Sequence, residues 1–446
     1  MLIPSWGELT GFNQVTIVLC AMTNPSLFPR FYWLERTAPT QPAIAEPGEA
    51  VTAALDALGL DGAELRGKEI AVAAGSRGVA GLREIVRAAC QWLLRQGATP
   101  FVFPAMGSHG GATGEGQRRV LADYGVTPEV TGAEIRSSME TILTGVTPEG
   151  FPVFADRNAW ESDGVLVINR VKPHTRFSGK IESGLLKMMA VGMGKAEGAR
   201  EVHRLASKHG FERVIRTVAG ALLASGKIVA GVAVVENALH QPAVVRAARP
   251  ANIVAVEEEM LAISKSLVPR IPFLHLDLLM VGEIGKNISG AGMDTKVTGR
   301  GVDLAPGEAP EIRLIYARDL TEESAGNSMG VGMADLIHER LYRKIDFDKM
   351  YVNARTSLNP EMARLPMWFR SDREALNIAL GALGGASPAE ARLAFIRNTL
   401  SLDLILVSEA LAAEARGLDG WRLSPESKWL EFDTEDNLRL PTFSAH

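Results

Sequence analysis

The hydrophobic positions of the chain change between two periods along most of its length. Short apolar runs predict four strands in the first half, at residues 68–75, 99–107, 163–171 and 227–237. Apolar residues that recur every three or four positions predict amphipathic helices at 79–97 and 113–125. Alternating strands and helices are typical of βαβ units, which build a largely parallel sheet flanked by helices.

The second half of the chain continues this alternation after a different kind of segment. A helix is predicted at 250–266, and residues 267–285 then carry two prolines followed by a buried strand. We therefore expect a crossing between domains near residue 270. Further apolar patterns predict a strand at 311–319, helices around 333–345 and at 372–385, and a strand at 402–410.

The length of the chain predicts more than one folding unit. A sequence of 446 residues is too long for one ordinary hydrophobic core. We expect an N-terminal extension over 1–40, an N-terminal domain over 41–270 and a C-terminal domain over 271–446. The predicted fold class is α/β, with two lobes that each hold a largely parallel sheet flanked by helices, and an active site in the cleft between them. Met22 is an alternative to Met1 as the true start, because regular patterning begins only after the proline-rich residues 36–50.

Composition narrows the possible partners. The apolar share is 46% and the charged share 22%, as in globular proteins, and the net charge of -5 gives no reason to expect a polyanion-binding surface. The two cysteines, Cys20 and Cys90, indicate neither a disulfide framework nor a metal site. The apolar run at 15–22 is too short to cross a bilayer and lacks a preceding basic segment. We expect a cytoplasmic protein without nucleic-acid or membrane partners, and homo-oligomer formation stays open.

Basic side chains follow the carboxyl ends of four predicted strands: Arg77, His109, His174 and Lys286. Ligands of open α/β sheets bind outside these strand ends, so the four side chains are candidates for one site. Imidazole suits proton transfer near neutral pH, which favours acid/base roles for the two histidines. A guanidinium and an ammonium group suit a substrate carboxylate.

Simpler interpretations of these residues stay open at this point. The segment around His109 is also typical of a glycine-rich turn whose amides receive a phosphate at a helix start. For Arg77 and Lys286 the alternative interpretation is a surface cation in water. Other histidines have no reactive neighbours in the sequence and are interpreted as structural: His240, His275 and His338.

Lys187 and His203 lie sixteen residues apart in a segment of helical composition. At ~100° per residue, one continuous helix would place them on nearly opposite faces. Three glycines, Gly192, Gly194 and Gly198, predict a break that would let the two side chains approach each other. From the residues alone, a lysine that lies along an amphipathic helix is the favoured interpretation of Lys187.

Several motifs resemble those of nickel-dependent lactate racemase and its wider superfamily of 2-hydroxyacid racemases and epimerases. The resemblance covers roughly residues 45–440 and rests on the Lys187-to-His203 spacing and on the motifs GSRG, PAMGSHGGAT, INRVKPHT and EIGKNISGAGMDT. Members of this superfamily carry a nickel pincer nucleotide, a nicotinic-acid-derived mononucleotide of the pyridinium dithio-carboxylate type. The resemblance implies an isomerase that moves a hydride between C2 of a 2-hydroxy acid and this cofactor.

The resemblance also implies a role for each matching residue. Lys187 resembles the lysine that tethers the cofactor covalently, and His203 resembles the histidine that binds nickel, a metal for which imidazole is a suitable ligand. His109 and His174 resemble the pair of bases that act on opposite sides of the substrate. The residues that resemble the substrate-carboxylate clamp are Arg77 and Lys286.

Departures from the lactate enzyme bear on the substrate. Three extra residues between His174 and Lys187 place Arg176 and Lys180 at the rim of the expected pocket. Glu283 stands where the lactate enzyme has glutamine; it would repel a second carboxylate but accept hydrogen bonds from extra hydroxyls. A larger or polyhydroxylated 2-hydroxy acid is therefore expected, and the two cations leave dicarboxylates open. Two more residues are candidates for the site: Trp368 as a pocket wall, and Asp294 as a contact to the cofactor ribose or a purely structural group.

The predicted function is thus racemisation or epimerisation at C2 of a 2-hydroxy acid. Two alternatives remain: a non-catalytic protein that binds the nickel pincer nucleotide, and an acid/base epimerase that works without a cofactor and uses the same two histidines.

Overall fold

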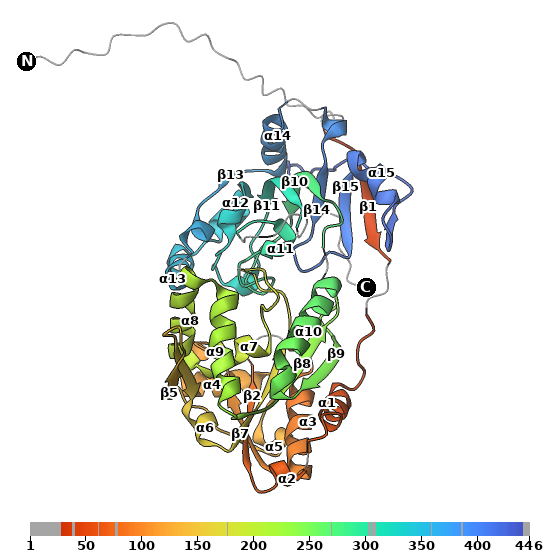
Figure 1. The fold of residues 1–446 in the computed structure, drawn as a ribbon. Coiled ribbons are helices and arrows are strands. Elements are labelled where there is room, and N and C mark those ends of the chain that lie inside the picture. The colour runs from red at the N-terminus through yellow and green to blue at the C-terminus, as the bar shows by residue number, and fades with distance from the viewer. Residues whose placement is uncertain are drawn as a thin grey trace, which may run out of the picture.

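The computed structural model describes residues 28–37, 41–60, 62–75, 79–175, 177–268, 270–301, 304, 309–357, 359–384 and 387–439. These residues form two α/β lobes, with the first sheet in the lower lobe of Figure 1 and the second in the upper. Arg77 and Arg176 lie outside the described residues. No helix within the described ranges is both long enough and apolar enough to cross a membrane.

The lower lobe is built on a six-stranded sheet with the order β4-β3-β2-β7-β8-β9. Its strands are β2 (Glu69–Ala74), β3 (Thr99–Pro104), β4 (Glu134–Ile135), β7 (Gly164–Arg170), β8 (Ile228–Glu236) and β9 (Pro242–Ala248). All neighbouring pairs are parallel except β8 and β9. The four strands predicted for this half are therefore confirmed. The strand order reverses between β2 and β7, which makes this the position where a ligand is expected.

The continuous apolar runs of these strands are explained by burial on both faces of the sheet. Val72, Leu166 and Val232 pack in one core with α3 (Leu82–Arg95), whereas Ala73, Val167 and Ala233 pack in another. That second core includes side chains of α9 (Phe211–Ala224) and α10 (Ile253–Leu267). The remaining helices of this lobe are α1 (Pro47–Asp56), α2 (Gly62–Leu65), α4 (Gly114–Asp123), α5 (Pro128–Thr131), α6 (Arg157–Glu161), α7 (Leu185–Lys187) and α8 (Lys195–His209). A hairpin, β5 (Thr141–Val146) and β6 (Pro152–Asp156), stands apart from the sheet.

The upper lobe contains an eight-stranded sheet with the order β13-β12-β11-β10-β14-β15-β1-β16. Its strands are β1 (Phe31–Arg36), β10 (His275–Val281), β11 (Glu311–Ala317), β12 (Leu336–His338), β13 (Met367–Phe369), β14 (Leu393–Ile396), β15 (Leu404–Ser408) and β16 (Trp421–Leu423). The strands from β13 to β14 are parallel, and β15, β1 and β16 add antiparallel pairs. The strand order reverses at β10, so this sheet has its own switch point.

Two features of the upper lobe differ from the sequence-based expectation. Residues 31–36 belong to the predicted N-terminal extension. In the structure they form β1, which pairs with β15 and β16 near one end of this sheet (Figure 1). The helix expected around 333–345 is a short strand, β12, followed by α12 (Glu339–Arg343). His338 stops the strand because its ring accepts a hydrogen bond from the Arg340 amide and caps the helix. The other helices are α11 (Thr295–Thr298), α13 (Phe347–Ser357), α14 (Asp372–Ala382) and α15 (Ala412–Arg416).

Candidate functional site

The segment from Leu185 to His209 crosses the carboxyl edge of the lower sheet in three differently wound parts. α7 runs into a π-helix over Met188–Met193, a turn follows at Gly194, and α8 begins at Lys195. Lys195 has a left-handed backbone (φ 52°), which a side-chain-bearing residue adopts only when its surroundings enforce it. The predicted break between Lys187 and His203 is therefore confirmed, at Gly194 and Lys195.

The π-helix rests directly on the ends of β2 and β3. A side chain at Gly75, the residue after β2, would come within 2.9 Å of Met188, and one at Gly192 would come within 2.6 Å of the Ala105 carbonyl oxygen. The Gly107 amide donates to the Gly192 carbonyl at 3.3 Å. These close approaches hold the His109 loop and the α7 end, which carries half-buried Lys187, against one edge of the sheet.

A buried polar network supports the loop that carries His109. The Lys195 ammonium, which is fully buried, donates to the Pro104 carbonyl at 2.6 Å and to Gln117 Oε1 at 3.0 Å. The Gln117 amide in turn donates to the carbonyls of Gly107 and His109. Lys195 also lies 3.0 Å from Asp156, whose other carboxylate oxygen caps α6 through the Ala159 amide. The network therefore fixes both ends of the turn between β3 and His109.

His174 lies in the loop after β7 and is held within a group of aromatic rings. Its ring centroid is 4.6 Å from that of Phe177 and 6.1 Å from that of Phe211, and the two phenylalanines stack at 5.1 Å. The exposed His203 ring, on α8, meets the same Phe211 edge-on at 5.5 Å. Phe211 therefore joins the candidate base to the candidate nickel ligand, although sequence reasoning did not single it out.

Glu182 anchors the His174 loop to both lobes. This fully buried carboxylate accepts the His174 amide at 2.6 Å and pairs with Lys265 of α10 at 2.7 Å and Lys296 of α11 at 2.5 Å. Next to it, the Thr295 hydroxyl donates to the Thr175 carbonyl at 2.5 Å. The position of His174 therefore depends on contacts with the upper lobe.

Another buried carboxylate lies at the start of the helix that ends in Lys187. Glu257 of α10 accepts the Leu186 amide at 2.8 Å, and Gly184 leaves room for its carboxylate, since any side chain there would collide with it. Burial raises the pKa of Glu257 to about 7, against which the amides of Leu186 and Leu185 favour the charged form. A group that titrates near neutral pH thus caps the helix of the candidate tether.

A cavity of about 420 Å³ lies between the lobes, beside His174. Lys172, Pro173 and Thr175 line it from the lower lobe, and Lys286 and Asp294 line it from the upper lobe. The Lys286 ammonium donates to the Gly290 carbonyl at 2.7 Å. His240, which sequence reasoning set aside as structural, also lines the cavity. The volume of this cavity is in the range of small-molecule sites.

The remaining candidates occupy different places. Asp294 caps α11 by accepting the Lys296 amide at 2.8 Å, and burial raises its pKa. Glu283 accepts a hydrogen bond from Asn398 at 3.0 Å and lies 3.5 Å from Arg397, outside the cavity lining. Lys180 is exposed and also outside that lining. Trp368 stacks on Tyr342 at 5.3 Å in β13, at the edge of the upper sheet and away from the cavity lining. Their roles in the site stay predictions.

The donors present suit a metal that arrives within an organic group. Among the described residues, no three His, Cys, Asp or Glu side chains gather to hold a metal ion. His203 is instead a single exposed imidazole on the helix after the π-helix, and Lys187 offers an amine at the end of the helix before it. One imidazole and one amine fit a cofactor that supplies the other metal donors itself.

Comparison with known proteins adds the class of fold. No protein-family model matches the sequence, and no curated protein matches it. The structure is similar to the lactate racemase apoprotein from Thermoanaerobacterium thermosaccharolyticum, with a TM-score of 0.50 and 14% identity over 81% of this chain and 93% of that one. A Thermotoga maritima crystal structure aligns with a TM-score of 0.47 and 16% identity over 73% of this chain and 83% of that one, too remote to support an inference. The fold is therefore lactate racemase-like.

Proposed function

We propose that the protein is an isomerase that racemises or epimerises a 2-hydroxy acid at C2 with a nickel pincer nucleotide. The observation that carries the proposal is the meeting of the His109 loop, the His174 loop and the Lys187 helix at the switch-point edge of a lactate racemase-like fold. Each of the three matches a motif of that superfamily.

The residues of the chain divide the work as follows. Lys187 would hold the cofactor covalently and His203 would bind its nickel. When bound, the cofactor supplies a hydride acceptor and donor for C2. His109 and His174 act as bases that take the hydroxyl proton from one enantiomer and return it to the other, and two are needed because the two hydroxyls point in different directions. Lys286 binds the substrate carboxylate from the upper lobe, together with Arg77, which lies outside the described residues.

The first test is the mass of the Lys187 peptide and the nickel content after purification from a host that makes the cofactor. A mononucleotide-sized adduct with stoichiometric nickel supports the proposal. Lys187→Arg keeps the charge but should lose the adduct. A wild-type peptide without adduct or nickel, from a host that loads a control enzyme, contradicts it.

A second measurement separates the cofactor-independent epimerase, which two histidines alone could support. Turnover in deuterated water should leave the C2 hydrogen unexchanged when a hydride returns to the same carbon. Extensive C2 labelling would instead indicate deprotonation at C2 by the histidines.

A non-catalytic binding protein is the other alternative. His109→Ala and His174→Ala should each abolish interconversion and keep bound nickel in the proposed enzyme. Unchanged behaviour in both variants would favour the binding protein.

A further inference from the structure

We propose that the interlobe cavity selects a substrate with two acidic groups, namely a 2-hydroxy acid that carries a second carboxylate. This inference rests on the proposed function and names the substrate class of the same site. The proposal is supported by the positively charged side chains that line the cavity from both lobes.

Cationic side chains outnumber carboxylates in the cavity wall. Six of them line it: Arg170, Lys172, Lys265, Arg270, Lys286 and Lys296. Among the described residues, two carboxylates belong to the same lining, Glu236 and Asp294. Glu182, behind the wall, pairs with two of the lysines, and Glu236 pairs with Arg170. Even with Glu182 included, six cations stand against three carboxylates.

Two titratable groups in the wall do little to reduce this excess. Burial raises the pKa of Asp294, and hydrogen bonding from the Lys296 amide opposes this shift. Burial also lowers the pKa of His240, which keeps this imidazole neutral near pH 7. A mono-acid neutralises one positive charge of such a cavity, whereas a diacid neutralises two.

The cations are also distributed to receive two separate groups. Arg170 ends β7 and Lys172 follows it in the lower lobe, whereas Lys286 and Lys296 come after β10 in the upper lobe. His174 lies in the lower-lobe loop between Pro173 and Thr175, which both line the cavity. A diacid that spans the cavity would engage both lobes with its reacting carbon beside this loop, and a mono-acid would engage only one.

Glu283 is the residue expected to repel a second carboxylate of the substrate, but its position in the structure weakens that expectation. Glu283 is directed to Asn398 and Arg397 and is not part of the cavity lining. The acidic group that would repel a diacid is therefore compensated by a neighbouring guanidinium.

Calorimetric titration of the apoprotein with 2-hydroxysuccinate and with lactate tests this inference without nickel or turnover. We expect 2-hydroxysuccinate to bind about tenfold more tightly or better, and its advantage to fall at high ionic strength. Lys172→Gln and Arg270→Gln should each weaken the diacid several-fold and change lactate much less. Lys68→Gln, an exposed lysine next to the opposite end of β2, is the control and should change neither.

Two outcomes would overturn the inference. The first is lactate binding as tightly as 2-hydroxysuccinate, or a diacid advantage that survives both substitutions. The second is tight binding of nicotinate mononucleotide to the same lysines without binding of 2-hydroxysuccinate, which would assign the cations to the phosphate of a cofactor. Since loading of Lys187 is measured separately, a missing adduct with intact diacid binding would refute the cofactor and not the substrate class.

Discussion

Each lobe contains an ion pair in which both side chains are almost completely buried, and the hydrogen bonds around the two pairs differ. Lys195 and Asp156 in the lower lobe are both 0% exposed, and Arg318 and Asp372 in the upper lobe are 5% and 0% exposed. Burying charge is costly, so each pair depends on its surrounding hydrogen bonds. Those bonds are plentiful in the upper lobe and sparse at Asp156 in the lower one.

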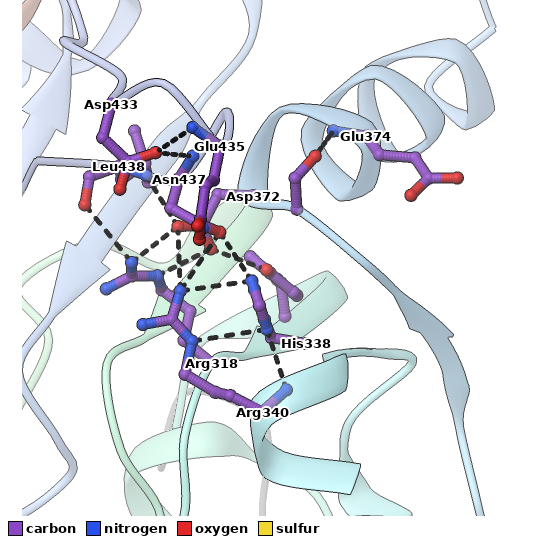
Figure 2. Close-up of polar contacts among 11 residues, drawn as sticks. Arg318, His338, Arg340, Asp372, Glu374, Asp433, Glu435, Asn437 and Leu438 are labelled. Atoms are coloured by element: carbon purple, nitrogen blue, oxygen red, sulfur yellow. Dashed lines mark hydrogen bonds and ion pairs between the residues drawn. The ribbon is translucent and has the colours of Figure 1, made fainter. Parts of the chain in front are cut away.

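Figure 2 shows the upper pair at the centre of a network that fastens the C-terminal segment. Asp372 accepts two hydrogen bonds from Arg318, at 2.8 and 2.6 Å, and one from the Leu438 amide at 2.7 Å. The Tyr316 hydroxyl adds another at 2.7 Å, and the His338 ring contacts Asn437. Burial alone would raise the pKa of Asp372, but the bonds and charge of Arg318 outweigh it and hold the pKa below its usual value.

The lower pair shows the opposite balance. Within the described part of the chain, Asp156 Oδ2 has Lys195 3.0 Å away but accepts no well-aligned hydrogen bond. Burial therefore raises the pKa of Asp156 and lowers that of Lys195 despite their mutual attraction. The Lys195 ammonium instead donates hydrogen bonds to Pro104 and Gln117, which support the His109 loop. The upper pair therefore fastens the C-terminal segment, whereas the lower pair supports the His109 loop and leaves one carboxylate oxygen without an aligned hydrogen bond.

The largest effect is expected when the well-satisfied pair is broken. Arg318→Met leaves Asp372 buried without its cation and should lower the free energy of unfolding by about 3–5 kcal/mol. Denaturant titration measures the loss, and the double variant with Asp372→Asn should recover part of it. The native Asp372 contribution is present above pH 3.8 and is lost as the pH falls through its lower folded pKa, so the variant should lose this acid-range slope. A smaller loss of unfolding free energy than that of Lys195→Met in the lower lobe would contradict the different roles assigned to the two pairs.

A second effect concerns the carboxylate that caps the Lys187 helix. The folded pKa of Glu257 is raised from 4.5 to about 7, so the folded state binds the extra proton. Stability should be highest below pH 4.5 and fall by about 3 kcal/mol as the pH rises to about 7. Glu257→Gln should remove this fall, as measured by urea unfolding from pH 4.5 to 8. A pH slope that persists unchanged in the variant would assign it to other groups.

Removal of the lower-lobe cation should cost less. Lys195→Met should reduce stability by about 2 kcal/mol, because Asp156 already has a raised pKa and can take up a proton in place of its partner. In the loaded enzyme, interconversion should fall while nickel content stays constant, since the His109 loop loses its support. Lys68→Met controls for loss of a lysine elsewhere. A stability loss equal to that of Arg318→Met would remove the distinction between the two pairs.

The sequence predicted the elements of this fold better than it predicted the groups that support the site. Apolar runs located β2, β3, β7 and β8 because these strands are buried on both faces. Edge strands such as β13 and β16 have only three residues each, too few to show a hydrophobic period, and were not predicted. Motif matches nominated His109 and His174, but the roles of Glu182 and Lys195 depend on distant partners, such as Lys296 at 114 and Gln117 at 78 residues away. The local signal that the sequence offers for Lys195 is its position directly after Gly194, at the predicted break.

The smallest change in stability, and the most specific in function, is expected at Glu182. Glu182→Gln keeps one acceptor for the His174 amide but removes the charge between Lys265 and Lys296, and should cost about 1 kcal/mol because both lysines reach solvent in part. The variant loosens the link between the upper lobe and the His174 loop, so the chemical shifts and titration of the His174 ring should change in NMR spectra of the apoprotein. Glu201→Gln, which removes the charge of a pair with the exposed Arg204 on α8, is the control and should leave them unchanged. Identical His174 titration in both variants would mean that the two lobes do not share control of this histidine, and that the lower lobe positions its base alone.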